Sequence, residues 1–126
     1  MLLVYMSLTG QTRKFIGKFD WPSLELTPDN AFTEIHEPYV IVAPTYEREV
    51  TDILFDFIET GNNASYLQGV AGGGNRNFNT LFCFTAKDIA EEFNVPLLHV
   101  FEFQGSDKDV NIMKEQVASL GQAGIK

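Results

Sequence analysis

The first twelve residues, MLLVYMSLTGQT (1–12), join an apolar run to a turn rich in hydroxyl groups. Residues 1–6 show no alternation of polar and apolar side chains, which predicts a strand buried on both faces of a parallel sheet. After the turn at 7–12, apolar side chains at helical spacing predict a short helix that ends before Trp21 and Pro22. A buried strand, a hydroxyl-rich loop and a helix in this order are typical of the first unit of an α/β fold.

The succession of a strand and a helix repeats along the rest of the chain. Further strands are predicted at 23–27, 39–43, 65–71 and 97–103, and further helices at 50–58, 82–93 and 110–120. Five strands alternating with four helices predict an open parallel sheet with helices on both faces, within a single domain over residues 1–126. Ligands bind such sheets at the carboxyl ends of the strands, which here are followed by loops at 7–12, 44–48, 72–79 and 104–107.

The loop after the first strand suits a phosphate group. Backbone N–H groups and the helix dipole favour an anion there, and the hydroxyls of Ser7, Thr9 and Thr12 add donors. Gly10 allows a close approach of the backbone, since it has no Cβ. Simple capping of the helix is the alternative, but the position directly after the first strand favours the phosphate. Neither a Walker A loop nor a G-x-G-x-x-G motif is present, so a monophosphate such as that of FMN is favoured over ATP or NAD.

Two later loops carry residues suited to a planar ring. Tyr46 follows Pro44 and Thr45 at the end of a predicted strand, where its ring can stack on a planar ligand, the alternative being an ordinary half-exposed tyrosine. The stretch GGGNRNF (72–78) begins with three glycines, which lose much backbone entropy on folding. This cost indicates a backbone that approaches a ligand closely or changes conformation, and a flexible solvent loop is the alternative.

Three of these stretches together carry a resemblance to a known family. The S-x-T-G-x-T pattern of residues 7–12 resembles the phosphate loop of flavodoxins. With GGGNRNF (72–78) and FEFQGSDKDV (101–110), the chain resembles the NrdI family over residues 2–120. The resemblance implies a flavodoxin-like three-layer sandwich with a five-stranded parallel sheet in the order 2-1-3-4-5, and FMN as the cofactor.

The residues expected to contact FMN lie in the four loops at the carboxyl ends of the strands. They are Ser7, Leu8, Thr9, Gly10, Gln11, Thr12, Pro44, Thr45, Tyr46, Gly72, Gly73, Gly74, Asn75, Asn77, Phe78, Phe103 and Gly105. No side chain is expected to be catalytic by itself, because the chemistry of such a protein takes place on the flavin.

The resemblance also implies a cellular role. NrdI proteins are encoded alongside class Ib ribonucleotide reductases, and their reduced FMN reacts with dioxygen. The resulting oxidant, superoxide, reaches the dimanganese centre of the small subunit, of the NrdF type, and generates its tyrosyl radical. The chain would then be an activating flavoprotein supplied by an unidentified flavin reductant, rather than a stand-alone metabolic enzyme. The alternatives are a generic flavodoxin that carries electrons, and a flavin-free α/β module that binds another phosphate ligand or a protein.

Composition narrows the possible partners. Against 17 acidic residues the chain has 9 Lys and Arg, which gives a formal charge of −8 and argues against nucleic acid and anionic membrane. Cys83 is the single cysteine, so neither a disulfide within the chain nor a CxxC pair is possible. His36 and His99 lack neighbours at metal-ligand spacing, so no metal site is expected, and His99 is expected to be a hydrogen-bonded structural residue. The apolar start is too short for a signal peptide, which predicts a cytoplasmic protein.

Overall fold

The structure, a computed structural model, describes residues 1–77 and 82–122. Its centre is a five-stranded parallel sheet in the order β2-β1-β3-β4-β5, so the predicted strand order is confirmed. The strands are β1 (Leu2–Tyr5), β2 (Ser23–Glu25), β3 (Tyr39–Ala43), β4 (Leu67–Gly74) and β5 (Leu97–Glu102). The helices are α1 (Gln11–Ile16), α2 (Arg48–Glu59), α3 (Asn63–Tyr66), α4 (Phe84–Glu92) and α5 (Asp107–Gln122).

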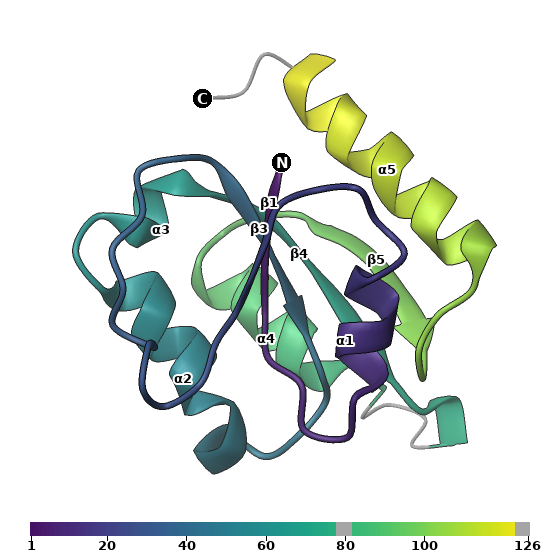
Figure 1. Cartoon of the computed structure of the whole chain (residues 1–126), viewed down its shortest axis with the longest axis horizontal. Helices are drawn as coiled ribbons and strands as arrows, with labels where there is room; N and C mark the ends of the chain where they lie inside the picture. The colour runs from purple at the N-terminus through teal and green to yellow at the C-terminus, as the bar shows by residue number, and fades with distance from the viewer. Residues whose placement is uncertain (78–81, 123–126) are drawn as a thin grey trace.

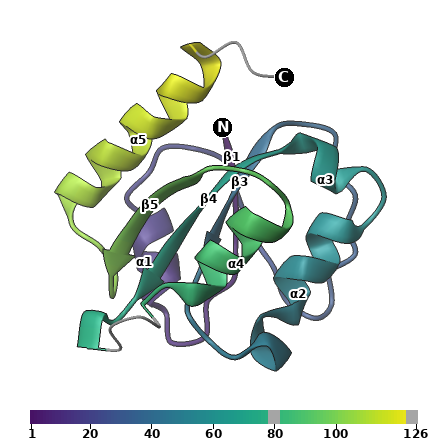
Figure 2. The same cartoon turned by 180° about the vertical axis from the view of Figure 1, so that it is seen from behind.

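Helices cover both faces of the sheet and complete the predicted three-layer sandwich. Helices α1 and α5 lie on one face, and α2 and α4 lie on the other (Figures 1 and 2). Alternate residues of β1 enter different cores, Leu2 and Val4 on the side of α2 and α4, and Leu3 and Tyr5 on the side of α1 and α5. The strand is therefore apolar throughout because both of its faces are buried, as the sequence pattern indicates.

The three glycines at 72–74 belong to strand β4, whereas the sequence predicts a strand that ends at Ala71 and a loop after it. A Cβ on Gly72 would lie 2.5 Å from the Cβ of Ala86 in α4. A Cβ on Gly73, on the other face, would lie 2.7 Å from the Phe101 ring. The glycines thus allow neighbouring groups to pack against the end of β4, and Gly73 and Gly74 also line the pocket described below.

The short helix α3 stands where the sequence predicts the start of the fourth strand. Its first residue, Asn63, is fully buried, and its amide nitrogen donates to the carbonyl oxygens of Thr33 and Phe57, each at 2.8 Å. The amide oxygen accepts the N–H of Ile35 at 2.9 Å. One buried side chain therefore connects α2 to the long segment between β2 and β3, and its burial is stable because it is hydrogen-bonded.

The hydroxyl of Tyr39 is buried without a hydrogen-bond partner among the described residues. Burial raises the pKa of this phenol, and the ring packs edge-on against Phe57 with 5.4 Å between centroids. Because an unsatisfied buried hydroxyl is costly, we expect Tyr39→Phe to raise the free energy of unfolding by about 1 kcal/mol in urea titrations. Tyr5→Phe is the matched control, and we expect it to lower stability, because the Tyr5 hydroxyl donates to Glu25 at 3.0 Å. A loss of stability in Tyr39→Phe would mean that this hydroxyl does have a partner.

Within residues 1–77 and 82–122, no helix combines the length and the apolar character that crossing a bilayer requires.

Candidate functional site

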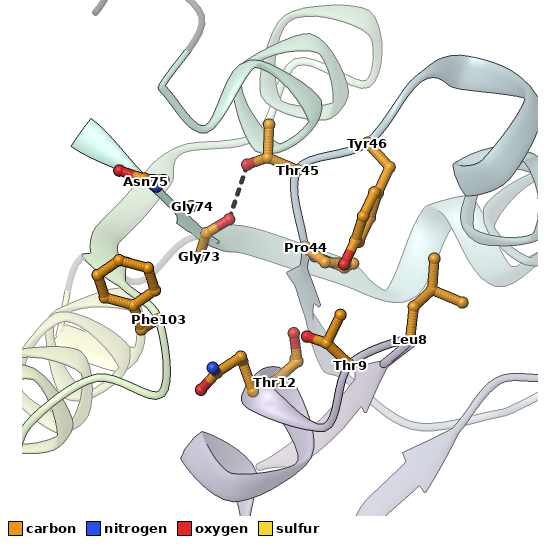
Figure 3. A pocket seen from close by; sticks show the side chains of 11 residues that line it. Leu8, Thr9, Thr12, Pro44, Thr45, Tyr46, Gly73, Gly74, Asn75 and Phe103 are labelled. Carbon is orange, nitrogen blue, oxygen red and sulfur yellow. Dashed lines mark hydrogen bonds between the residues drawn. The ribbon is translucent and has the colours of Figure 1, made fainter. Parts of the chain in front are cut away.

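A pocket of about 300 Å³ opens at the carboxyl ends of β1, β3, β4 and β5 (Figure 3). This volume lies in the range of small-molecule sites, and its place at the strand ends is the usual one in open α/β sheets. The lining residues all belong to the set predicted from the sequence. They are Leu8, Thr9, Gln11, Thr12, Pro44, Thr45, Tyr46, Gly73, Gly74, Asn75 and Phe103.

The loop after β1 contributes the hydroxyl groups of the pocket. Thr9 and Thr12 both line it, and Thr12 is only 4% exposed, so its hydroxyl is held in a confined position (Figure 3). Gly10 precedes α1 with a φ of 90°, a conformation that glycine adopts without strain. Ser7 is not brought to the pocket lining, and its Oγ instead accepts the N–H of Arg13 at 3.3 Å. Thr9 and Thr12 therefore present hydroxyls to the pocket, whereas the Ser7 hydroxyl joins the two ends of the loop.

Two aromatic side chains lie on the walls of the pocket, Tyr46 after β3 and Phe103 after β5 (Figure 3). Phe103 is 52% exposed and has a φ of 53°, which is rare and unfavourable for a bulky residue. Its N–H donates to the carbonyl oxygen of Gly74 at 3.1 Å, which continues the contact between β4 and β5 beyond the strand. A strained backbone that presents an aromatic ring at the rim of a pocket indicates a functional position.

Hydrogen bonds fix the segment that connects β3 to α2. The Thr45 hydroxyl donates to the carbonyl oxygen of Gly73 at 2.7 Å (Figure 3). Tyr46 donates its N–H to the Thr85 hydroxyl at 3.3 Å, and that hydroxyl donates back to the Tyr46 carbonyl at 3.1 Å. Thr85 lies at the start of α4 and belongs to no sequence motif, so the sequence alone does not indicate its role. Thr85 is buried, and its two hydrogen bonds to the Tyr46 backbone hold the segment that carries the Tyr46 ring.

Among the described residues, Gly10, Gly72, Asn77 and Gly105 were also predicted, and they lie outside the pocket lining. Gly72 packs beneath α4, and Asn77 donates its N–H to the Asn75 side chain at 2.9 Å. Gly105 has a φ of 70° and lies so close to Phe15 that a Cβ would approach that ring to 2.6 Å. Phe78 lies outside the described residues.

The turn between β5 and α5 is held by Asp109. This side chain accepts the N–H of Ser106 at 2.8 Å, and its own N–H donates to the Ser106 hydroxyl at 3.2 Å, which is a reciprocal capping arrangement. Ser106 therefore caps the start of α5. Asp109 also bonds the His99 ring at 2.7 Å, so His99 is a hydrogen-bonded structural residue as expected.

Because of these contacts, the contribution of Asp109 to the stability of the fold depends on pH. Burial alone would raise the pKa of Asp109, but the hydrogen bonds from His99 and Ser106 outweigh it and lower this pKa below its usual value of 3.8. A carboxyl with a lowered pKa stabilises the fold above its usual pKa, and this contribution is lost as the pH falls through the folded value. We expect Asp109→Asn to be less stable than the parent chain at pH 7 and this difference to shrink toward pH 3 in urea titrations. Asp107→Asn, at an exposed position of the same turn, is the control, and an equal pH-dependent loss there would contradict the assignment.

Comparison with known proteins agrees with this geometry. The family model described as NrdI flavodoxin-like matches residues 3–115, nearly the whole chain. The chain belongs to the NrdI flavodoxin-like family. Among solved structures, it is similar to a short-chain flavodoxin associated with a PDU bacterial microcompartment, with a TM-score of 0.68 and 16% sequence identity. That match covers 98% of this chain and 97% of the other, and at this identity it shows the shared fold.

Members of this family bind FMN. FMN has a phosphate at one end and a planar ring at the other. The pocket has hydroxyl donors from the loop after β1, and aromatic side chains after β3 and β5. No Lys or Arg is among the lining residues that the structure describes, so these residues offer a phosphate neutral donors. The residues present fit FMN in both chemistry and arrangement.

Proposed function

We propose that this NrdI-type chain binds FMN in the pocket at the carboxyl ends of the strands. The observation that carries the proposal is the convergence of hydroxyl donors and aromatic side chains from loops far apart in the sequence. Thr9 and Thr12 would bind the phosphate, because hydroxyls donate well to an anion held at a confined site. Tyr46 and Phe103 would lie against the ring, where aromatic surfaces bury apolar area and stack.

The proposed role of the bound flavin is to supply an oxidant to a metalloprotein. Bound and reduced FMN would transfer one electron to dioxygen and so produce superoxide. Superoxide would pass to the dimanganese centre of a class Ib ribonucleotide reductase small subunit, where it serves in formation of the tyrosyl radical. Family membership supports this role, and so does the exposure of Leu8 and Phe103 at the rim, which places the pocket at the surface.

Charge supports a protein partner over a nucleic acid. At −8, the chain would be attracted to a basic docking surface and repelled by phosphate backbones. Glu47 and Glu49 lie at the start of α2, directly after the loop that carries Tyr46. We propose that these carboxylates assist docking of the reductase small subunit beside the pocket.

The absorption spectrum after reconstitution with FMN tests the cofactor. Bound-flavin bands with a stoichiometry of one FMN per chain are expected, and their absence would overturn both redox roles and leave a flavin-free binding module.

The recipient is tested separately. The reduced flavoprotein is mixed with dioxygen and a manganese-loaded class Ib small subunit, and the tyrosyl radical is measured by electron paramagnetic resonance. We expect radical only when the flavoprotein is present and reduced. If a small subunit that is competent with another superoxide source gives no radical, the oxidant role fails and a generic electron carrier is supported instead.

A further inference from the structure

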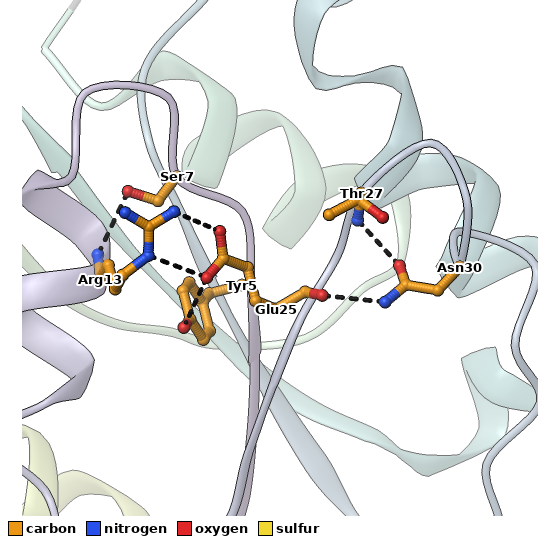
Figure 4. Close-up of polar contacts among 6 residues, drawn as sticks. All are labelled: Tyr5, Ser7, Arg13, Glu25, Thr27 and Asn30. Carbon is orange, nitrogen blue, oxygen red and sulfur yellow. Dashed lines mark hydrogen bonds and ion pairs between the residues drawn. The ribbon is translucent and has the colours of Figure 1, made fainter.

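A bidentate ion pair between Arg13 and Glu25 joins helix α1 to the edge strand β2 (Figure 4). Arg13 donates from Nε to Oε1 of Glu25 at 2.9 Å and from Nη2 to Oε2 at 2.6 Å. The Tyr5 hydroxyl donates to the same Oε1 at 3.0 Å. Tyr5 ends β1 and Glu25 ends β2, so the ends of two neighbouring strands and the first turn of α1 are tied together.

Arg13 also contacts the loop itself. Its backbone N–H donates to the Oγ of Ser7, which joins the two ends of the loop. The backbone of Arg13 thus ties the two ends of the loop that carries Thr9 and Thr12, and its side chain anchors that backbone to Glu25 at the sheet edge.

Glu25 is held in turn by the segment that follows β2. Asn30 donates from its side-chain nitrogen to the carbonyl oxygen of Glu25 at 3.0 Å, and its side-chain oxygen accepts the N–H of Thr27 at 2.8 Å (Figure 4). The hydrogen bonds from Arg13 and then from Tyr5 outweigh the desolvation of Glu25, and they lower the pKa of this carboxyl. The carboxylate that receives Arg13 is thus fixed through both its backbone and its side chain.

Such an ion pair contributes little to overall stability. The side chains of Arg13 and Glu25 are 56% and 28% exposed, and solvent screens the attraction between charges at such positions. The bidentate geometry instead gives orientation, because two parallel hydrogen bonds from the rigid Nε/Nη2 fork hold the planar guanidinium in line with the carboxylate. Its expected effect is therefore on the arrangement of the loop more than on the fold.

We propose that Arg13, clamped by Glu25, is a positioning residue that makes the site selective for a phosphorylated flavin over one without phosphate. The inference rests on the proposed binding of FMN in this pocket. Arg13 holds the loop at 7–12 so that its hydroxyls face a phosphate, and it does not line the pocket itself. A ligand without phosphate makes no use of that arrangement, so loss of the clamp weakens FMN binding alone.

The test compares the dissociation constants of FMN and riboflavin, measured by quenching of flavin fluorescence in the full chain. Arg13→Lys keeps the positive charge but loses the bidentate geometry, and Glu25→Gln keeps Arg13 but weakens its clamp. We expect each to weaken FMN binding about 10-fold, with riboflavin binding changed less than about 2-fold. Arg48→Gln is the matched control, since Arg48 forms an exposed ion pair with Asp52 on α2, and both constants should stay unchanged.

Thermal unfolding without flavin shows whether the variants remain folded. Equal weakening of FMN and riboflavin would indicate a merely structural role and would overturn the inference. If Arg13→Lys and Glu25→Gln bind FMN like the parent chain while Arg13→Gln does not, charge alone matters and the positioning role is wrong. If the parent chain itself does not bind FMN, the proposed function fails and this inference with it. Normal FMN binding in all variants overturns the inference alone.

Discussion

Replacing Thr12 by Val is expected to weaken FMN binding about 10- to 100-fold, because hydrogen bonds to charged groups contribute about 1.5–3 kcal/mol. Thr12 is 4% exposed and lines the pocket from the first turn of α1. Val has nearly the same shape, so the loss isolates the hydroxyl from the packing of the side chain. The dissociation constant is measured by titrating the flavin-free chain with FMN and following flavin fluorescence.

Two comparisons make the Thr12 result specific. Thr12→Ser retains a hydroxyl and is expected to bind FMN within about 3-fold of the parent chain. Riboflavin, which has no phosphate, should bind Thr12→Val and the parent chain alike. If Thr12→Val binds FMN as tightly as the parent chain, the phosphate does not lie against this loop.

The second large effect concerns the fold under the pocket. Gly72→Ala is expected to lower the free energy of unfolding by about 1–3 kcal/mol, which is typical of an added methyl group in a packed core. The new Cβ would lie 2.5 Å from the Cβ of Ala86, and neither group can rotate away. Urea titration measures the loss, and the double variant Gly72→Ala with Ala86→Gly should recover part of it, since the second change removes the clashing methyl.

Gly17→Ala is the matched control for Gly72→Ala. A Cβ on Gly17 would lie 3.5 Å from the nearest atom, which is an ordinary contact, and its φ of −61° suits any residue. We expect this variant to be at least as stable as the parent chain, because Ala has less backbone entropy to lose. A stable Gly72→Ala chain that cannot bind FMN would show that Gly72 serves the ligand rather than the packing of α4.

The sequence predicts the arrangement of the sheet well because that arrangement depends on local patterns. The apolar run at 39–43 is a strand with the predicted bounds, and the loop at 7–12 follows a buried strand as expected. Parallel strands place their carboxyl ends at one edge, so residues such as Thr12, Tyr46 and Phe103 could be assigned to one pocket before their contacts were known.

Features that depend on distant neighbours were not predictable in this way. Glycine has low strand propensity, yet residues 72–74 continue β4 because they pair with β5, and they are glycines because Ala86 and Phe101 occupy the space that a Cβ would need. Asn63 and the short α3 are held by contacts to the segment near Thr33, thirty positions away. Neither the pattern around Gly72 nor that around Asn63 contains information on these partners.

The polar side chains of the first loop show the same limit. Ser7 and Thr12 are both hydroxyl residues in one motif, but only Thr12 lines the pocket, because Ser7 accepts the N–H of Arg13. The pairing of Arg13 with Glu25 arises only when β2 lies beside β1. A motif can therefore indicate the ligand. Only the structure shows which of its residues line the pocket and which hold the loop in place.

Amide hydrogen exchange of the chain with and without FMN tests the central claim most directly. If the pocket at the strand ends is the FMN site, the cofactor should slow exchange in the segments at 7–13, 45–47, 73–76 and 103–106, with little change in α3 and at the far ends of the strands. FMN that binds and instead protects a different surface, or that leaves these four segments unchanged, would contradict the account.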